Sequence, residues 1–138
     1  MKYKLEVGFA VMAGVLMMGS LLFAHHGSSV SYDVSKRITL RGTVTEFVWS
    51  NPHSQVYFDV KDEKGSVVNW GGEMNSPGVL ARAGWTRHSV KPGDQITVTL
   101  APSKAPGTHV GLVGRVVLAN GQALEGNQVL RPGASGAE

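Results

Sequence analysis

The sequence predicts an all-β domain with one short helix: an OB-fold-like five-stranded Greek-key barrel of order β-β-β-α-β-β, preceded by an N-terminal apolar signal helix. Three observations lead to this fold class. From Ile38 onward, apolar and polar residues alternate in short runs separated by turn residues, as in an antiparallel sheet. This period changes once, after Ser76-Pro77, to that of a short helix. Residues 7–23 form an apolar run behind two lysines, which is typical of an export signal.

The N-terminal apolar run ends at Ala24, a small residue suited to the position before a cleavage site. We expect cleavage there, which places the protein in the periplasm or outside the cell. The alternative is an uncleaved anchor in the inner membrane, with the domain facing the periplasm. A run of this length lies at the lower limit of about 17 to 25 residues for a membrane-spanning helix, so we favour cleavage over retention as an anchor.

The first expected strand is long and bent. Ile38, Leu40 and Val44 share one parity, whereas Phe47 and Trp49 continue on the other, and a bulge near Thr45 and Glu46 would reconcile the two. Asn51-Pro52-His53 ends this strand, because proline lacks a backbone donor. A second strand follows with apolar positions Val56, Phe58 and Val60, then a turn at residues 62–65 and a third strand with Val68 and Trp70.

The second half of the barrel begins after the helix. Ser76 is expected to cap the helix and Gly84 to end it, and Lys91-Pro92-Gly93-Asp94 is the next turn. Alternating residues predict a fourth strand over 96–100 and a fifth over 110–118, and Asn120-Gly121 predicts a turn into a short extra strand. The expected core comprises Ile38, Leu40, Val44, Phe58, Val60, Val68, Trp70, Leu80, Ile96, Val98, Leu112 and Val116.

The chain is thereby divided into four parts. Residues 1–24 are the signal peptide or uncleaved anchor, 25–37 an N-terminal arm, 38–124 the OB-like barrel, and 125–138 a flexible C-terminal tail of small and polar residues.

Composition excludes several classes of function. The chain has no Cys, so disulfides, thiolate nucleophiles and thiol-rich metal sites are absent. The net charge of +3 comes without a run of Lys or Arg, so nucleic-acid binding is not expected. No nucleophile elbow, phosphate loop or His-Glu-x-x-His motif occurs, and Glu46, Asp59 and Glu73 are interpreted as separate surface charges. We therefore do not expect an enzyme, and the alternative of an enzymatic activity would require a bound metal.

Histidine is the residue type through which a metal could bind. Cleavage after Ala24 makes His25 the N-terminal residue, whose amine and imidazole could chelate one ion. A further imidazole from His26, His53 or His109 would complete an arrangement resembling the histidine brace of copper proteins, and copper(II) favours such nitrogen ligands. The alternative is a solvated histidine pair that binds nothing specifically.

A second candidate site is the rim of the barrel between the first two strands, where OB-folds commonly bind ligands. Trp49, Asn51, His53 and Tyr57 are the residues expected there, with an unknown envelope protein or a small ligand as the partner. Contact with the membrane is expected only through an uncleaved signal segment. The structural alternative is a plain turn, in which Asn51 caps backbone groups and His53 packs against Trp49.

A set of short motifs in one order resembles a family of small exported bacterial proteins catalogued only as a domain of unknown function. The motifs begin at His25-His26-Gly27-Ser28 and include Trp49-Ser50-Asn51-Pro52-His53, Asn75-Ser76-Pro77, Arg82-Ala83-Gly84-Trp85-Thr86-Arg87 and Lys91-Pro92-Gly93-Asp94. The similarity covers about residues 25–124. It implies that the histidine pair and the Asn-Pro-His turn are family features, but it implies no activity. Trp70-Gly71-Gly72-Glu73 departs from the apolar strand end expected there.

Overall fold

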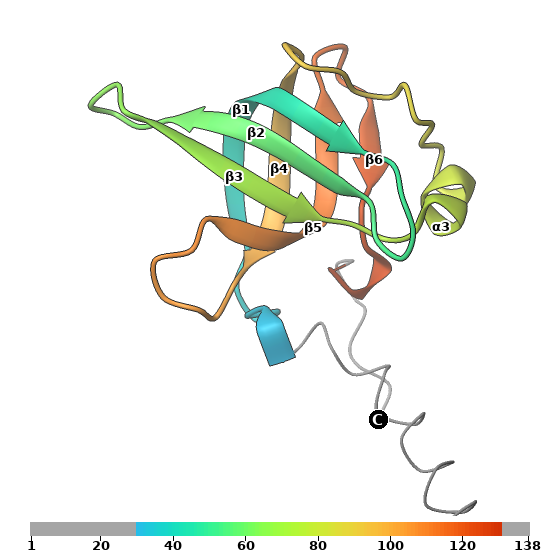
Figure 1. Cartoon of the computed structure of the whole chain (residues 1–138), viewed down its shortest axis with the longest axis horizontal. Helices are drawn as coiled ribbons and strands as arrows, with labels where there is room; N and C mark the ends of the chain where they lie inside the picture. The colour runs from blue at the N-terminus through green and yellow to red at the C-terminus, as the bar shows by residue number, and fades with distance from the viewer. Residues whose placement is uncertain (1–29, 131–138) are drawn as a thin grey trace, which may run out of the picture. The chain divides into compact units, whose positions relative to one another are not determined.

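A computed structural model describes residues 30–130, most of which form one β-barrel (Figure 1). The chain divides into two units, 1–30 and 31–138, and the barrel belongs to the second. The elements in chain order are β1 (Ile38–Val48), β2 (Gln55–Lys61), β3 (Val67–Glu73), α3 (Pro77–Arg82), β4 (Gln95–Pro102), β5 (Val110–Leu118), β6 (Ala123–Glu125) and the 3-10 helix η2 (Gln128–Leu130).

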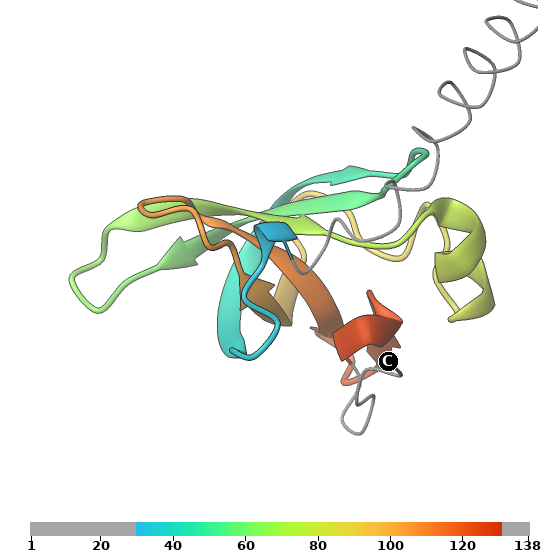
Figure 2. The same ribbon diagram turned by 90° about the horizontal axis from the view of Figure 1, so that it is seen from below.

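Strand pairing closes the first five strands into a barrel. The sheet order is β3-β2-β1-β4-β5-β6, and β3 also pairs with β5 in parallel, with Gly71 opposite Val110 and Glu73 opposite Leu112. The long β1 serves both halves, because it pairs with β2 and with β4. The predicted OB-like barrel with one short helix is therefore confirmed, and Figure 2 shows α3 at one end of the strands.

The bend predicted in β1 is a bulge at Thr45. The pairing with β2 shifts register between Val44 and Glu46, so two residues of β1 face one of β2. The shift moves the inward face from the parity of Val44 to that of Phe47, which explains why the apolar pattern changes parity there.

Helix α3 begins after Ser76 with Pro77 as its first residue, as predicted. The Ser76 side chain makes no capping hydrogen bond, so that part of the expectation was wrong. The Ser76 carbonyl instead accepts from the amides of Val79 and Leu80, each at 3.0 Å. Gly84, at φ 92°, follows the helix in the left-handed conformation that glycine adopts without strain.

The buried apolar residues form two clusters. The main one fills the barrel and contains Val44, Phe58, Leu80, Ile96, Val98 and Val116 of the expected core. Ile38, Leu40, Val60 and Trp70 are partly buried against it, whereas Val68 is only half-buried.

Leu112 was expected in the barrel core but belongs to the second cluster, with Ala101 and Leu130. The register of β5 with β4 shifts between Thr99 and Leu100, which leaves Gly114 without a partner and changes the inward parity of β5 from that of Val116 to that of Val113. Val113 faces the barrel core, and Leu112 is covered by Tyr32 and Val34 of the arm. Strand β5 is therefore buried on both faces, which a strict alternation could not predict.

Glycines allow β3 to close against β5. A Cβ at Gly72 would lie 2.5 Å from Val113 Cγ2, and a Cβ at Gly71 would lie 3.2 Å from the Tyr57 ring and 3.3 Å from Val110 Cγ1. The glycine pair that looked out of place in the sequence thus lies where β3 pairs with β5, and it leaves room for the side chains of Val110 and Val113.

Both ends of the barrel domain extend beyond the predicted limits of 38–124. In the arm, Tyr32 bridges to Ser103, and at the other end β6 reaches Glu125 and Leu130 of η2 is 6% exposed. Apolar contacts made by these segments explain the extension. The predicted signal segment and residues 131–138 lie outside the described residues, and among the described helices none is long and apolar enough to cross a membrane.

Candidate functional site

The loop between β1 and β2 holds His53 beside the end of β3. The Asn51-Pro52 peptide bond is cis, and Ser54 is fully buried. The Ser54 amide donates to the Asn75 carbonyl at 3.1 Å, and the Met74 amide donates to the Ser54 carbonyl at 2.9 Å. These two backbone bonds fix the loop to the segment that leaves β3.

His53, Glu73 and Tyr32 form a chain of polar contacts, called the histidine cluster below. His53 Nδ1 lies 2.5 Å from Glu73 Oε1, and the Tyr32 hydroxyl donates to Glu73 Oε2 at 2.6 Å. Both carboxylate oxygens are therefore occupied. The Glu73 side chain is 25% exposed and that of His53 is 52% exposed, so Glu73 is half-buried and the imidazole of His53 is accessible to solvent.

Electrostatics in the histidine cluster indicate which atoms donate protons to Glu73. Burial, followed by the hydrogen bond to Glu73 and its negative charge, raises the pKa of Tyr32 well above its usual range. Tyr32 therefore remains a neutral donor. A contact between Nδ1 and an ionised carboxylate requires a proton on Nδ1, and in the neutral ring this leaves the Nε2 lone pair free. The half-exposed imidazole thus offers one open ligand atom.

A shallow cleft of about 130 Å³ adjoins the cluster on the outer face of β2 and β3. Tyr32 and Glu73 line it together with Tyr57, whose hydroxyl donates to Gln55 Oε1, and with the two glycines of β3. Tyr57 points outward from the barrel, as the alternation of β2 predicted. A glycine beneath the Tyr57 ring leaves room for the ring to lie flat on the strand.

The remaining predicted rim residues lie apart from this cleft. The Trp49 ring packs at a tilt on Phe47, with 5.9 Å between centroids, and Phe47 stacks on Trp85 at 5.8 Å. Asn51 is exposed, and neither Trp49 nor Asn51 lines the cleft. Of the four expected rim residues, the structure brings His53 and Tyr57 to the same region.

The predicted metal ligands are not gathered within the described residues. The His109 ring packs edge-on against Trp70, with 5.3 Å between centroids, whereas His53 contacts Glu73. Within residues 30–130, no group of three or more His, Asp or Glu side chains is placed to hold a metal ion. His25 and His26 lie outside the described residues.

Glu73 was expected to be a separate surface charge, and that expectation was wrong. It pairs with His53 and accepts from Tyr32, whose role the sequence also did not indicate. The available signal was the pairing of β2 with β3, which places Glu73 opposite Gln55, two residues after His53.

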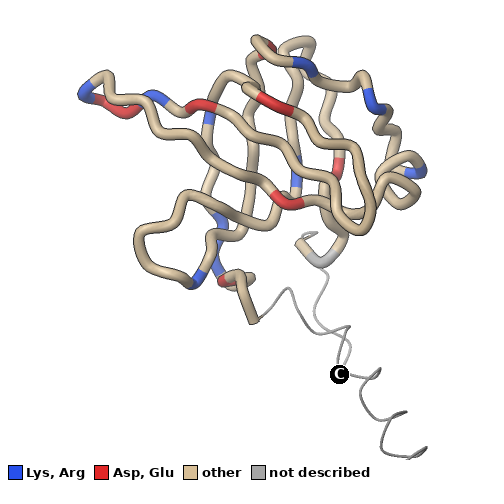
Figure 3. The backbone as a smooth tube through the Cα atoms, in the orientation of Figure 1, with Lys and Arg blue, Asp and Glu red and all other residues tan. Residues whose placement is uncertain are grey.

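Charged residues are spread over the strands and loops of the barrel, as Figure 3 shows for the described part of the chain.

The sequence was compared with models of known protein families. Residues 13–113 match the model of a family of unknown function, DUF6152. The chain belongs to this family. The DUF6152 match includes both predicted terminal histidines and the whole histidine cluster, and it ends within β5. No curated protein and no solved structure matches the chain.

Proposed function

We propose that this DUF6152 protein is an exported binding module that holds a copper ion through histidine nitrogens. The observation that supports the proposal most is the hydrogen-bonded pair of His53 and Glu73. Histidines that ligate metals usually donate their other ring N–H to a carboxylate or carbonyl, which fixes the ring and raises its basicity. His53 has this arrangement through Nδ1, and Tyr32 in turn holds the carboxylate.

One imidazole does not make a copper site, so the proposal requires ligands from outside the described residues. The sequence offers the amine and imidazole of His25 after cleavage, and the imidazole of His26. Tyr32 comes seven positions after His25, and at about 3.3 to 3.6 Å per residue a chain of this length reaches up to roughly 25 Å. The arm is therefore long enough for these nitrogens to join His53.

Copper is favoured by the type of ligand. The chain has no Cys, so soft thiolate ligands are absent, and the proposed set is entirely nitrogen. Among divalent first-row ions copper(II) binds such sets most tightly, in tetragonal geometry. Copper(II) is therefore the ion that this chain would retain in competition with zinc or nickel.

Titration of the processed protein with copper(II) tests this proposal. Protein is recovered from a periplasmic fraction, and its N-terminal residue is read by mass spectrometry, which also tests export and cleavage. We expect one equivalent to bind, His25→Ala or an added residue ahead of His25 to weaken binding at least 100-fold, and Glu73→Gln to weaken it about 10- to 100-fold. His88→Ala, at an exposed histidine away from the cluster, is the matched control.

Equal affinity in wild type, His25→Ala and Glu73→Gln would refute the histidine site. A protein recovered with residues 1–24 still attached would refute the cleaved N-terminus, and with it the chelating amine.

The cleft beside Tyr57 supports a second candidate function, in which the barrel rim binds a small ligand or an envelope protein without metal. Ligand sites combine aromatic and apolar walls with a few polar groups, and here Tyr32, Tyr57 and Glu73 provide both. In that case, capture of a partner from an envelope fraction would depend on Tyr57 and His53 and would survive chelation with EDTA. Loss of capture on chelation would favour copper instead.

A further inference from the structure

A second cleft lies where β4, β5 and β6 meet the arm before β1 and the 3-10 helix η2. Its volume is about 230 Å³, and its lining residues are Arg37, Thr99, Gly114, Arg115, Glu125 and Leu130. None of them belongs to the histidine cluster. Pockets for drug-sized ligands measure about 300 to 1,000 Å³, so this cleft, called the arginine cleft below, suits a smaller molecule.

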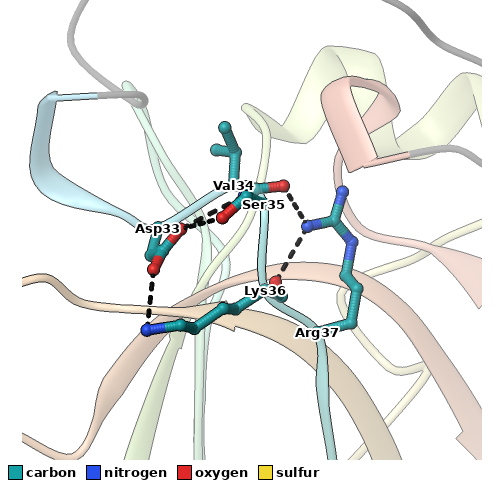
Figure 4. Close-up of polar contacts among 5 residues, drawn as sticks. All are labelled: Asp33, Val34, Ser35, Lys36 and Arg37. Atoms are coloured by element: carbon teal, nitrogen blue, oxygen red, sulfur yellow. Dashed lines mark hydrogen bonds and ion pairs between the residues drawn. The ribbon is translucent and has the colours of Figure 1, made fainter.

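The Arg37 guanidinium is held in place by backbone carbonyls. Its Nη1 donates to the carbonyl of Val34 and, at 2.9 Å, to that of Lys36, as Figure 4 shows. The turn that carries these carbonyls is itself fixed, because Asp33 accepts from Ser35 Oγ at 2.6 Å and pairs with Lys36 at 3.1 Å. Within residues 30–130 no carboxylate pairs with Arg37, so its charge and its other N–H groups can act on a ligand.

Arg115 and Glu125 face each other across β5 and β6 without forming an ion pair. They are register partners in that antiparallel pairing, and both line the cleft. The ion pairs within residues 30–130 are Lys36 with Asp33, His53 with Glu73 and Lys91 with Asp94, so both side chains remain available. The arginine cleft therefore presents two positive charges and one negative charge to a ligand, and the positive charge of Arg37 is held in place by its two carbonyl partners.

We propose that the arginine cleft binds a small zwitterion that carries a carboxylate and an ammonium group, such as a free amino acid or a short peptide. Arginine recognises a carboxylate through paired N–H donors, and Arg37 and Arg115 supply two such groups. Glu125 accepts from the ammonium group. A plain anion would satisfy the arginines but would be repelled by Glu125, which is why we infer a ligand of mixed charge.

Close packing of η2 on β5 forms one wall of the arginine cleft. A Cβ at Gly114 would lie 3.0 Å from Leu130 Cβ, so glycine at this position allows η2 to pack against β5 and close one side. The DUF6152 match ends at residue 113, so Arg115 and Glu125 lie outside it. Arg37 and Thr99 lie inside the match, so the family match covers one part of the cleft, whereas none of its lining residues takes part in the copper proposal.

Amide NMR of the ¹⁵N-labelled protein, in the presence of EDTA, tests the inference with alanyl-alanine as the probe. We expect saturable shifts at Thr99, Gly114 and Arg115. Affinity should fall at least tenfold for Arg115→Gln, and less for Arg115→Lys, which keeps the charge but loses the paired donors. Amidating the dipeptide's carboxylate should have the same effect as Arg115→Gln. Arg82→Gln on α3 is the control and should leave the affinity unchanged.

The role of Glu125 has its own readout. Acetylating the dipeptide's amine should weaken binding to the wild-type protein but not to Glu125→Gln, and the amide spectrum of each variant confirms that it is folded. Absence of saturable shifts, or equal affinity in wild type, Arg37→Gln and Arg115→Gln, would overturn the inference. Inorganic phosphate binding more tightly than the dipeptide would also overturn it, because the site would then be a simple anion site.

Discussion

The histidine cluster and the arginine cleft hold their charges in opposite ways. In the cluster, both oxygens of Glu73 are already used by His53 and Tyr32, so the carboxylate only orients the imidazole and one nitrogen remains open. In the cleft, Arg115 and Glu125 stand opposite each other without pairing, so their charges stay open to a ligand. The first arrangement suits a metal ion, which needs a fixed lone pair, and the second suits a charged organic molecule.

Both regions depend on strand β5, but on different faces and neighbours. The histidine cluster stands on β3 where it closes against β5, and the arginine cleft is walled by η2 where it packs on Gly114. Substitutions can therefore remove the support of one region while leaving the other in place.

Gly72→Val should have the largest effect on stability. Its Cβ would approach Val113 Cγ2 to 2.5 Å at the junction of β3 and β5. Overpacking of this kind lowers the free energy of unfolding by about 1 to 3 kcal/mol. Because valine is branched at Cβ, we expect a loss of about 3 kcal/mol for this variant. Urea unfolding followed by tryptophan fluorescence measures it. Gly78→Ala, where a Cβ would meet nothing within 4 Å, is the control, and an equal loss there would contradict the closure.

Leu130→Ala, where η2 packs on β5, should lower the free energy of unfolding by about 2 kcal/mol. This value lies at the low end of the range for Leu→Ala, because Leu130 packs in a small cluster. Leu130 is 6% exposed and packs with Ala101 and Leu112. The variant should widen the arginine cleft and weaken dipeptide binding without changing copper affinity. Equal losses of both ligands would show that the two regions are not separable.

Tyr32→Phe should lower the free energy of unfolding by about 1.5 kcal/mol, because it leaves one oxygen of Glu73 without its hydrogen bond from the arm. The effect should also depend on pH. The fold raises the pKa of Tyr32 above its usual value of 10.0. The contribution of the Tyr32 hydroxyl to the free energy of unfolding is therefore complete below pH 10 and falls as the pH rises further. Thermal unfolding between pH 8 and 11 should therefore show the difference between wild type and Tyr32→Phe shrinking at the alkaline end.

Tyr57→Phe is the matched control for this pH dependence, since Tyr57 bonds to Gln55 and not to a carboxylate. A constant difference between wild type and Tyr32→Phe across that pH range would contradict the role assigned to the pair of Tyr32 and Glu73.

Ser54→Ala should have the smallest effect. The Ser54 hydroxyl is fully buried and has no hydrogen-bond partner within residues 30–130. Since an unpaired buried hydroxyl carries a desolvation cost, its removal should be neutral or stabilise the protein by up to about 1 kcal/mol. A loss of more than about 1 kcal/mol in urea unfolding would show that the hydroxyl does have a partner.

The fold was largely predictable because its signals are local. The parity change around Thr45, the Asp62–Gly65 turn and the Asn120-Gly121 turn each constrain a few neighbouring residues, and the structure contains all three. The place of Leu112 outside the barrel core was not predictable, because its burial depends on the arm and η2 covering the outer face of β5.

The polar sites were less predictable, because their members are distant in sequence. Tyr32 and Glu73 are 41 residues apart, and they meet only once β3 has closed against β5 and the arm has docked beside it. Arg37 and Arg115 likewise come from the arm and from β5. His53 could be named from its loop, but its partner could not.

The copper complex of the processed protein is the most direct test of the central claim that the barrel orients His53 for a metal. Electron paramagnetic resonance of the 1:1 copper(II) complex detects coupling to the nitrogens that bind the ion. We predict a tetragonal spectrum with several coupled nitrogens in wild type, the loss of one imidazole in His53→Ala, and an altered spectrum in Glu73→Gln. Identical spectra for wild type and His53→Ala, or the spectrum of hydrated copper in both, would contradict the claim.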